Sequence, residues 1–195
     1  MIPRHLQIAL ILMLLVAFGL GFYALQLKRR AEQTQQQADT RPVAPPVAGP
    51  TEPVTLWVAY DDEGVLRQRT VQIALPPEPA ERARQALRAL FAAYLEKPSP
   101  HSLGDGADVK DVYLVNDTTA VIDTNAAFAD AHRSGVLVEE LTVISMLQTF
   151  ASALPKVTRV KILVDGHERE TLAGHADLKA FYDLPTINQL AREMQ

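Results

Sequence analysis

The chain has 195 residues, of which 48% are hydrophobic and 22% are charged, and it contains no cysteine. A disordered chain would be poorer in apolar residues, and the lack of thiolates excludes zinc fingers, iron–sulfur proteins, cysteine hydrolases and disulfide-stapled miniproteins. The formal net charge of −4 is uneven: residues 1–53 carry +2 and residues 54–195 carry −6, and an acidic domain of this kind is not expected to bind nucleic acid.

Residues 1–5 form a short N-terminus ahead of an apolar segment, residues 6–27, in which no side chain is charged. A helix of 22 residues is roughly 33 Å long, enough to cross the hydrocarbon core of a bilayer. The alternative is a cleaved signal peptide, which has a shorter apolar region followed by a small-residue cleavage site. Here the run ends in aromatic residues and a basic cluster, so the pattern predicts a retained transmembrane anchor.

Two arguments about the orientation of this anchor oppose each other. Lys28, Arg29 and Arg30 follow the segment and only Arg4 precedes it, so the positive-inside rule favours a cytoplasmic C-terminal domain. A short N-terminus, one span and a proline-rich spacer are instead the usual layout of a domain that faces the envelope. We expect a single-pass protein of the inner or plasma membrane with an extracytoplasmic, periplasmic domain.

Residues 28–53 predict a linker in two parts. The first part, to Ala38, is polar and rich in glutamine, and suits a continuation of the membrane helix into water. From Arg41 to Pro53 five of the 13 residues are proline, which fixes φ and removes backbone donors, so extended polyproline II structure is expected. At about 3.1 Å per residue this part reaches roughly 40 Å. It is either a spacer that holds the domain away from the bilayer or a linker without a specific role.

Residues 54–184 are predicted to form one domain. Alternating apolar residues predict a hairpin of strands at 54–60 and 65–75. Helical spacing of apolar residues predicts a helix over 83–94. Two further strands, at 109–115 and 118–123, flank an Asn-Asp pair and predict a second hairpin.

The longest apolar-periodic stretch, residues 136–154, carries two apolar stripes and predicts the core helix. A strand follows at 157–164, with Arg159 and Lys161 predicted to face water, and Asp165-Gly166 predicts a tight turn into a returning strand at 168–172.

Residues 185–195 form a C-terminal tail with a weak helical pattern. The predicted fold class is therefore α+β, with a mostly antiparallel sheet covered by two helices.

Three segments carry a pattern that is typical of a known family. They are Val112–Phe128, the helix that contains Leu147–Phe150, and Val157–Gly166, followed by Leu172-Ala-Gly-His175. Through them residues 54–184 resemble the GerMN domain, also called the sporulation and spore germination domain. The resemblance implies an α/β domain related to ring-building motifs, in envelope proteins that act as accessory or assembly factors without enzymatic activity or cofactor. The family includes lipoproteins, whereas this chain has a predicted membrane helix, and it holds one such domain rather than a tandem pair.

The most catalytic-looking residues are Asp123 and Asp165, each at the end of a predicted strand. Two converging carboxylates could act as an acid/base pair, as in glycoside hydrolysis. The favoured interpretation is structural: the segment Asp123-Thr124-Asn125 caps the following turn, and Asp165 occupies the first central position of a hairpin turn ahead of Gly166. We therefore predict no catalytic residue.

Among the remaining candidates, Trp57 is the one predicted interaction residue. It lies opposite the core-facing residues of its strand, so it either faces a protein or glycan partner or is buried by a covering helix, which is the favoured interpretation. His167, Glu168 and His175 are interpreted as surface residues rather than metal ligands, and no metal or cofactor is expected.

The sequence thus favours a non-catalytic, membrane-anchored envelope protein that acts through protein–protein interaction. Its expected partners are the membrane, other envelope proteins and a second copy of the chain. The first alternative is a module that binds peptidoglycan or glycan, and a weaker one is a hydrolase that uses Asp123 and Asp165.

Overall fold

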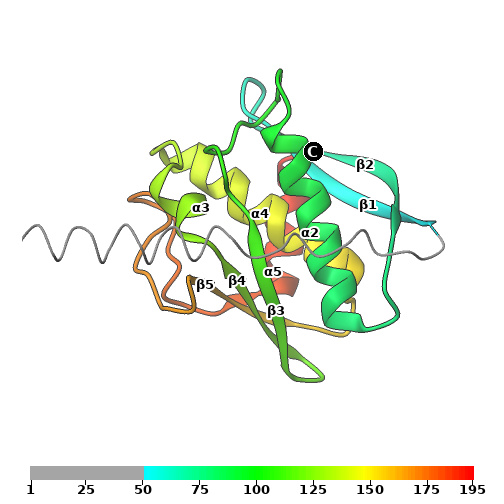
Figure 1. The fold of residues 1–195 in the computed structure, drawn as a ribbon. Helices are drawn as coiled ribbons and strands as arrows, with labels where there is room; N and C mark the ends of the chain where they lie inside the picture. Colours follow the sequence, from blue (N-terminus) through cyan, green and yellow to red (C-terminus); the bar gives the residue numbers. More distant parts are fainter. Residues whose placement is uncertain (1–50) are drawn as a thin grey trace, which may run out of the picture. The chain divides into compact units, whose positions relative to one another are not determined.

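The computed structural model describes residues 51–195, which belong to one compact unit (Figure 1). The predicted membrane anchor at 6–27 and nearly all of the predicted linker at 28–53 lie outside the described residues. In chain order the elements are β1 (Thr51–Tyr60), β2 (Val65–Ala74), α2 (Pro79–Leu95), β3 (Val109–Asn116), β4 (Thr119–Thr124), α3 (Ala126–Asp130), α4 (Val136–Ala153), β5 (Arg159–Val164), β6 (Tyr182–Asp183) and α5 (Leu184–Glu193).

The first sheet is the predicted hairpin of β1 and β2, which pair antiparallel from Thr51↔Ala74 to Tyr60↔Val65. Gly64 closes the turn with φ of +67°, a value that glycine adopts without steric cost. β1 begins three residues earlier than expected and takes in Pro53, which was assigned to the linker. Proline is tolerated there because, among the strands of residues 51–195, β1 pairs only with β2.

The second sheet has four strands in the order β3-β4-β5-β6. The predicted hairpin of β3 and β4 is confirmed, whereas β4 and β5 pair in parallel and β6 returns antiparallel to β5. The structure therefore has two sheets where the sequence predicted one. A parallel pair needs a long crossover, and residues 125–158 supply it through α3 and α4. Strand patterns alone do not reveal which strand pairs with which.

Lys161 corrects another expectation, because it is only 4% exposed although it was predicted to face water. Its ammonium group donates to the Lys179 carbonyl and lies 3.1 Å from the Glu168 carboxylate. The predicted strand at 168–172 is absent: this segment is irregular, and it runs on to Lys179 and Phe181, beside Lys161. A polar side chain that finds such partners can be buried without a large penalty.

The long helix α4 is the core element, as predicted. It packs against β1, α2 and α5 (Figure 1), and its apolar side chains are buried almost all round except at the first turn. By length and composition alone it could cross a membrane, but most of it is buried inside this domain. It also carries four hydroxyl residues at helical spacing, and these are Thr142, Ser145, Thr149 and Ser152.

Two of these hydroxyls supply hydrogen-bond partners to the edge of β1 that faces away from β2. Thr149 Oγ1 accepts from the Trp57 backbone N–H at 2.9 Å, and Ser145 Oγ donates to the Trp57 carbonyl at 2.6 Å. Tyr94 of α2 accepts from the Ala59 N–H at 2.8 Å. Because unpaired buried backbone groups are costly, these side chains replace the missing neighbouring strand.

We predict that Thr149→Val destabilises the domain by about 1–2 kcal/mol, because the Trp57 N–H would lose its acceptor while the shape of the side chain is kept. Denaturant unfolding followed by Trp57 fluorescence measures the change. Thr149→Ser, which keeps the hydroxyl, is the matched control and should lose less. Equal stability of Thr149→Val and the wild type would contradict this role for the hydroxyl.

Candidate functional site

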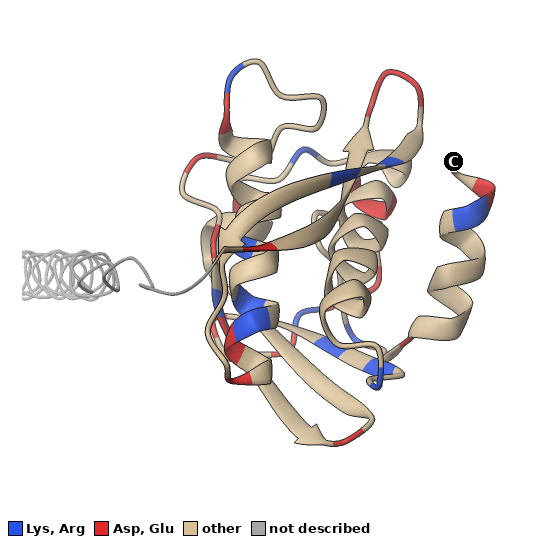
Figure 2. Cartoon of the chain, turned by 90° about the vertical axis from the view of Figure 1, so that its right-hand side faces the viewer, with Lys and Arg blue, Asp and Glu red and all other residues tan. Residues whose placement is uncertain are grey.

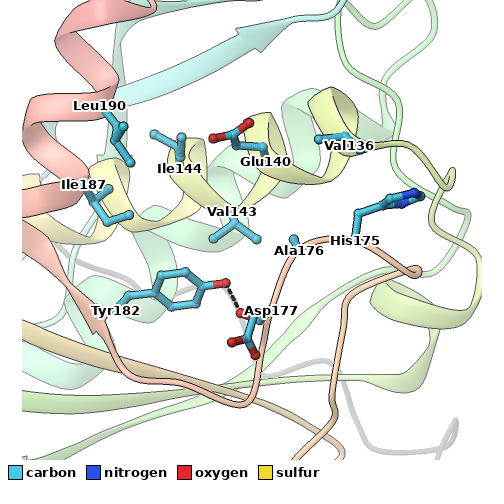
Figure 3. Close-up of a pocket in the computed structure, with 10 residues that line it drawn as sticks. All are labelled: Val136, Glu140, Val143, Ile144, His175, Ala176, Asp177, Tyr182, Ile187 and Leu190. Carbon is cyan, nitrogen blue, oxygen red and sulfur yellow. Dashed lines mark hydrogen bonds between the residues drawn. The ribbon is translucent and has the colours of Figure 1, made fainter.

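A surface groove of about 320 Å³ lies between α4, α5 and the segment that leads into β6 (Figure 3). This volume is at the lower end of the range for ligand pockets. The lining residues are Val136, Glu140, Val143, Ile144, His175, Ala176, Asp177, Tyr182, Ile187 and Leu190. The groove is therefore mostly apolar, with a few polar side chains among its lining.

The apolar wall of the groove follows from the patterns of two helices. Val143, Ile144 and Ile187 are buried, whereas Val136 is 65% exposed and Leu190 is 36% exposed. On α4 the lining residues recur at one-turn spacing, so they share one face. α5 has no charged residue before Arg192, near its C-terminal end (Figure 2). An apolar surface thus continues from the core out to solvent.

The polar lining of the groove includes the carboxylates of Glu140 and Asp177 and the imidazole of His175, and neither Lys nor Arg lines it. No basic side chain among residues 51–195 forms an ion pair with Glu140, whose side chain lies along the groove. The Tyr182 hydroxyl donates to the Asp177 carbonyl, and its pKa is raised by burial and by the Asp177 charge. The groove is therefore suited to a cation beside an apolar group.

Glu139 holds the segment that forms one side of the groove. It is fully buried, and one carboxylate oxygen accepts from the backbone N–H groups of Ala173, His175 and Ala176 at 2.9–3.0 Å. The other oxygen accepts from Gly135 N–H at 3.1 Å and lies 2.9 Å from His175 Nδ1. Burial alone would raise the pKa of Glu139, but these hydrogen bonds lower it to about 2.

A second buried polar cluster lies where α4 meets the loops after β1, α2 and α3. Thr142 Oγ1 lies 2.7 Å from His101 Nε2 and 2.8 Å from His132 Nε2. His101 Nδ1 lies 2.5 Å from Asp61, which also pairs with Arg133. Burial lowers the pKa of both imidazoles. Each of these polar groups has a partner within the fold, so the cluster ties loops to α4.

The two candidate carboxylates, Asp123 and Asp165, lie at the same end of the parallel pair β4–β5, and both bind backbone. Asp123 accepts from Gly166 N–H at 2.7 Å, and Asp165 accepts from Ala126 N–H at 3.1 Å and pairs with Lys110. The turn predicted at Asp165-Gly166 is confirmed, with φ of +51° and +74°. The two residues therefore lie at the same end of the sheet, and each stabilises a turn through a hydrogen bond to the backbone.

Trp57 is half-buried against α4, and its indole N–H donates to Ser152 at 3.1 Å. It does not line the groove. His167 and His175 make separate contacts. The His167 ring forms a hydrogen bond with the Asp165 carbonyl in its own turn, and the His175 ring forms one with the Glu139 carboxylate. Within residues 51–195 no three His, Cys, Asp or Glu side chains are grouped as metal ligands would be.

Comparison with known proteins identifies the class to which the chain belongs. The family model described as Germane, sporulation and spore germination, matches residues 55–170, which is more than half of the chain. The chain belongs to this family, as its motifs predicted. No curated protein sequence matches the chain.

Among solved structures, the chain is similar to the first GerMN domain of the sporulation protein GerM from Bacillus subtilis, with 20% identity, a TM-score of 0.49, and coverage of 67% of this chain and 95% of that one. The tandem GerMN domains of GerM give 22% identity and a TM-score of 0.48 over 67% of this chain, and the match spans 45% of the tandem structure. A candidate lipoprotein from Clostridium perfringens gives 16% identity and a TM-score of 0.47, with coverage of 73% and 93%.

We predict that Glu139 makes the domain sensitive to acid. Its folded pKa, about 2, lies below the ordinary 4.5, so the stabilisation is complete above pH 4.5 and is lost as the pH falls toward 2. The loss over this window is about 3 kcal/mol. Free energies of unfolding measured from pH 6 to pH 2.5 should decline less steeply in Glu139→Gln than in the wild type.

The matched control for this prediction is Glu140→Gln, one residue further along α4, which should keep the full acid-dependent loss of stability. An unchanged pH profile in Glu139→Gln would show that other groups cause the acid sensitivity.

Proposed function

We propose that the chain is a single-pass accessory protein of the cell envelope, whose extracytoplasmic domain acts by binding other proteins and not by catalysis. Its membership of the sporulation and spore germination family supports an envelope role. The predicted anchor at 6–27 and the linker after it support a domain held near the membrane surface.

The observation that carries the proposal is the contrast between the polar interior and the groove. Asp123 and Asp165, the carboxylates that a hydrolase would need, are bound to backbone N–H groups. The groove, by contrast, presents exposed Val136 and Leu190 to solvent. Exposed apolar surface with a polar rim is typical of a contact site for another protein.

The alternative from the sequence, a module that binds peptidoglycan or glycan, makes a different prediction. Isolated muropeptides would then bind the full chain without any protein partner. Trp57 is the only tryptophan in the chain, so its fluorescence reports such binding if the domain responds. Turnover of the same fragments would instead support the hydrolase alternative and contradict the proposal.

We predict that the domain is labelled from outside the inner membrane. The chain has no cysteine, so Asp117→Cys, in the exposed β3–β4 turn, gives a single reactive thiol. A maleimide that crosses the outer but not the inner membrane should label it in intact cells. Pro3→Cys, on the other side of the predicted span, is the matched control and should react only after the inner membrane is permeabilised. The reverse pattern would place the domain in the cytoplasm.

A further inference from the structure

The groove has a chemical character that identifies the kind of segment it fits. Its apolar floor is formed by Val143, Ile144 and Ile187, which are buried by neighbouring side chains, and its apolar rim by the exposed Val136 and Leu190. Filling it with an apolar side chain would remove the rim from water, which favours binding in proportion to the apolar area buried. An apolar group is therefore the expected central contact.

The charge of the groove selects among apolar occupants. Glu140 and Asp177 contribute two carboxylates, and no Lys or Arg lines the groove to neutralise them. Asp177 uses one carboxylate oxygen to accept from Lys179 N–H at 2.6 Å, and its carboxylate points away from Val143 and Glu140 (Figure 3). Glu140 therefore supplies the negative charge along the apolar wall. A cationic group next to the apolar contact would complement this charge.

The sides of the groove are held in place before any partner binds. The segment with His175, Ala176 and Asp177 is fixed by Glu139. α5 is fixed to α4 by its buried residues and by a hydrogen bond of 2.8 Å from Gln148 to Asn188. A preformed groove avoids part of the ordering cost of association.

We propose that this groove binds a polypeptide segment of a partner protein in which a large apolar side chain lies within two residues of a Lys or Arg. The apolar side chain enters between Ile144 and Leu190, and the cation reaches Glu140. The proposal rests on the proposed function, because it assigns the surface through which the domain would act. A bilayer is the less suitable occupant, because the anionic lipid surface of a membrane repels a carboxylate rim.

The probe for this proposal is a display library of random 12-residue peptides, selected against the full chain in detergent. The enriched peptides should contain Leu, Ile, Met or Phe within two positions of Lys or Arg. Synthetic versions should lose at least tenfold in affinity when their Lys or Arg is replaced by Glu. Enriched peptides that lack this pattern would overturn the proposal.

Variants of the protein locate the peptide site. Glu140→Lys and Leu190→Ser should each weaken the peptides at least tenfold, and both residues are exposed enough for substitution without loss of the fold. The matched controls are Asp117→Lys, another acidic residue outside the groove, and Leu137→Ser, which is 46% exposed beside Val136 but does not line the groove. The proposal would be overturned if the control variants lost as much peptide affinity as the groove variants. It would also be overturned if the wild type bound anionic vesicles as tightly as it binds the peptides.

Cross-linking in intact membranes separates this inference from the proposed function. A photoreactive residue at position 190 should capture a protein that is lost with Glu140→Lys, whereas one at position 137 should capture less. If other exposed positions capture partners and position 190 does not, the groove assignment fails and the proposed function stands. If no position on the domain captures any protein, both fail.

Discussion

Within residues 51–195 no strand lies beside the edge of β1 that faces away from β2, and this edge is hydrogen-bonded to helix side chains. Thr149 and Ser145 of α4 form hydrogen bonds with the Trp57 backbone, and Tyr94 of α2 accepts a hydrogen bond from the Ala59 N–H. This arrangement requires α4 to lie along β1 in a single register, because a shift of one residue would remove both hydroxyls from their partners. It also joins the two-stranded sheet, which would be marginal alone, to the rest of the domain.

The same register positions the groove. Once the hydroxyl face of α4 is fixed against β1, Glu139 can meet the backbone of residues 173–176 only from the first turn of the helix. The face with Val143 and Ile144 is then left to receive α5. The groove is therefore a consequence of how α4 is held, and the exposed residues at its rim are the part of the apolar face that α5 does not reach.

Local patterns were sufficient to predict most elements but not their arrangement. The two hairpins, α2, α4 and the Asp165-Gly166 turn were predicted because each depends on neighbouring residues. The parallel pairing of β4 with β5 and the burial of Lys161 depend on segments far apart in sequence. The groove was missed for the same reason: it joins α4 to the segment around residues 175–182 and to α5, whose pattern was weak. A signal existed in Glu140, a carboxylate on an otherwise apolar face of α4.

The polar residues of α4 also distinguish a core helix from a membrane span. α4 is long and apolar enough to cross a membrane, and the sequence of residues 6–27 contains no charged side chain. In α4, however, hydroxyl residues recur along one face, and two of them, Ser145 and Thr149, hydrogen-bond the backbone of β1. Residues 6–27 carry no such recurring face, with glutamine only at its two ends. The prediction of a membrane span at residues 6–27 rests on this lack of internal polar side chains, because a helix in lipid needs no side-chain partners outside its own backbone.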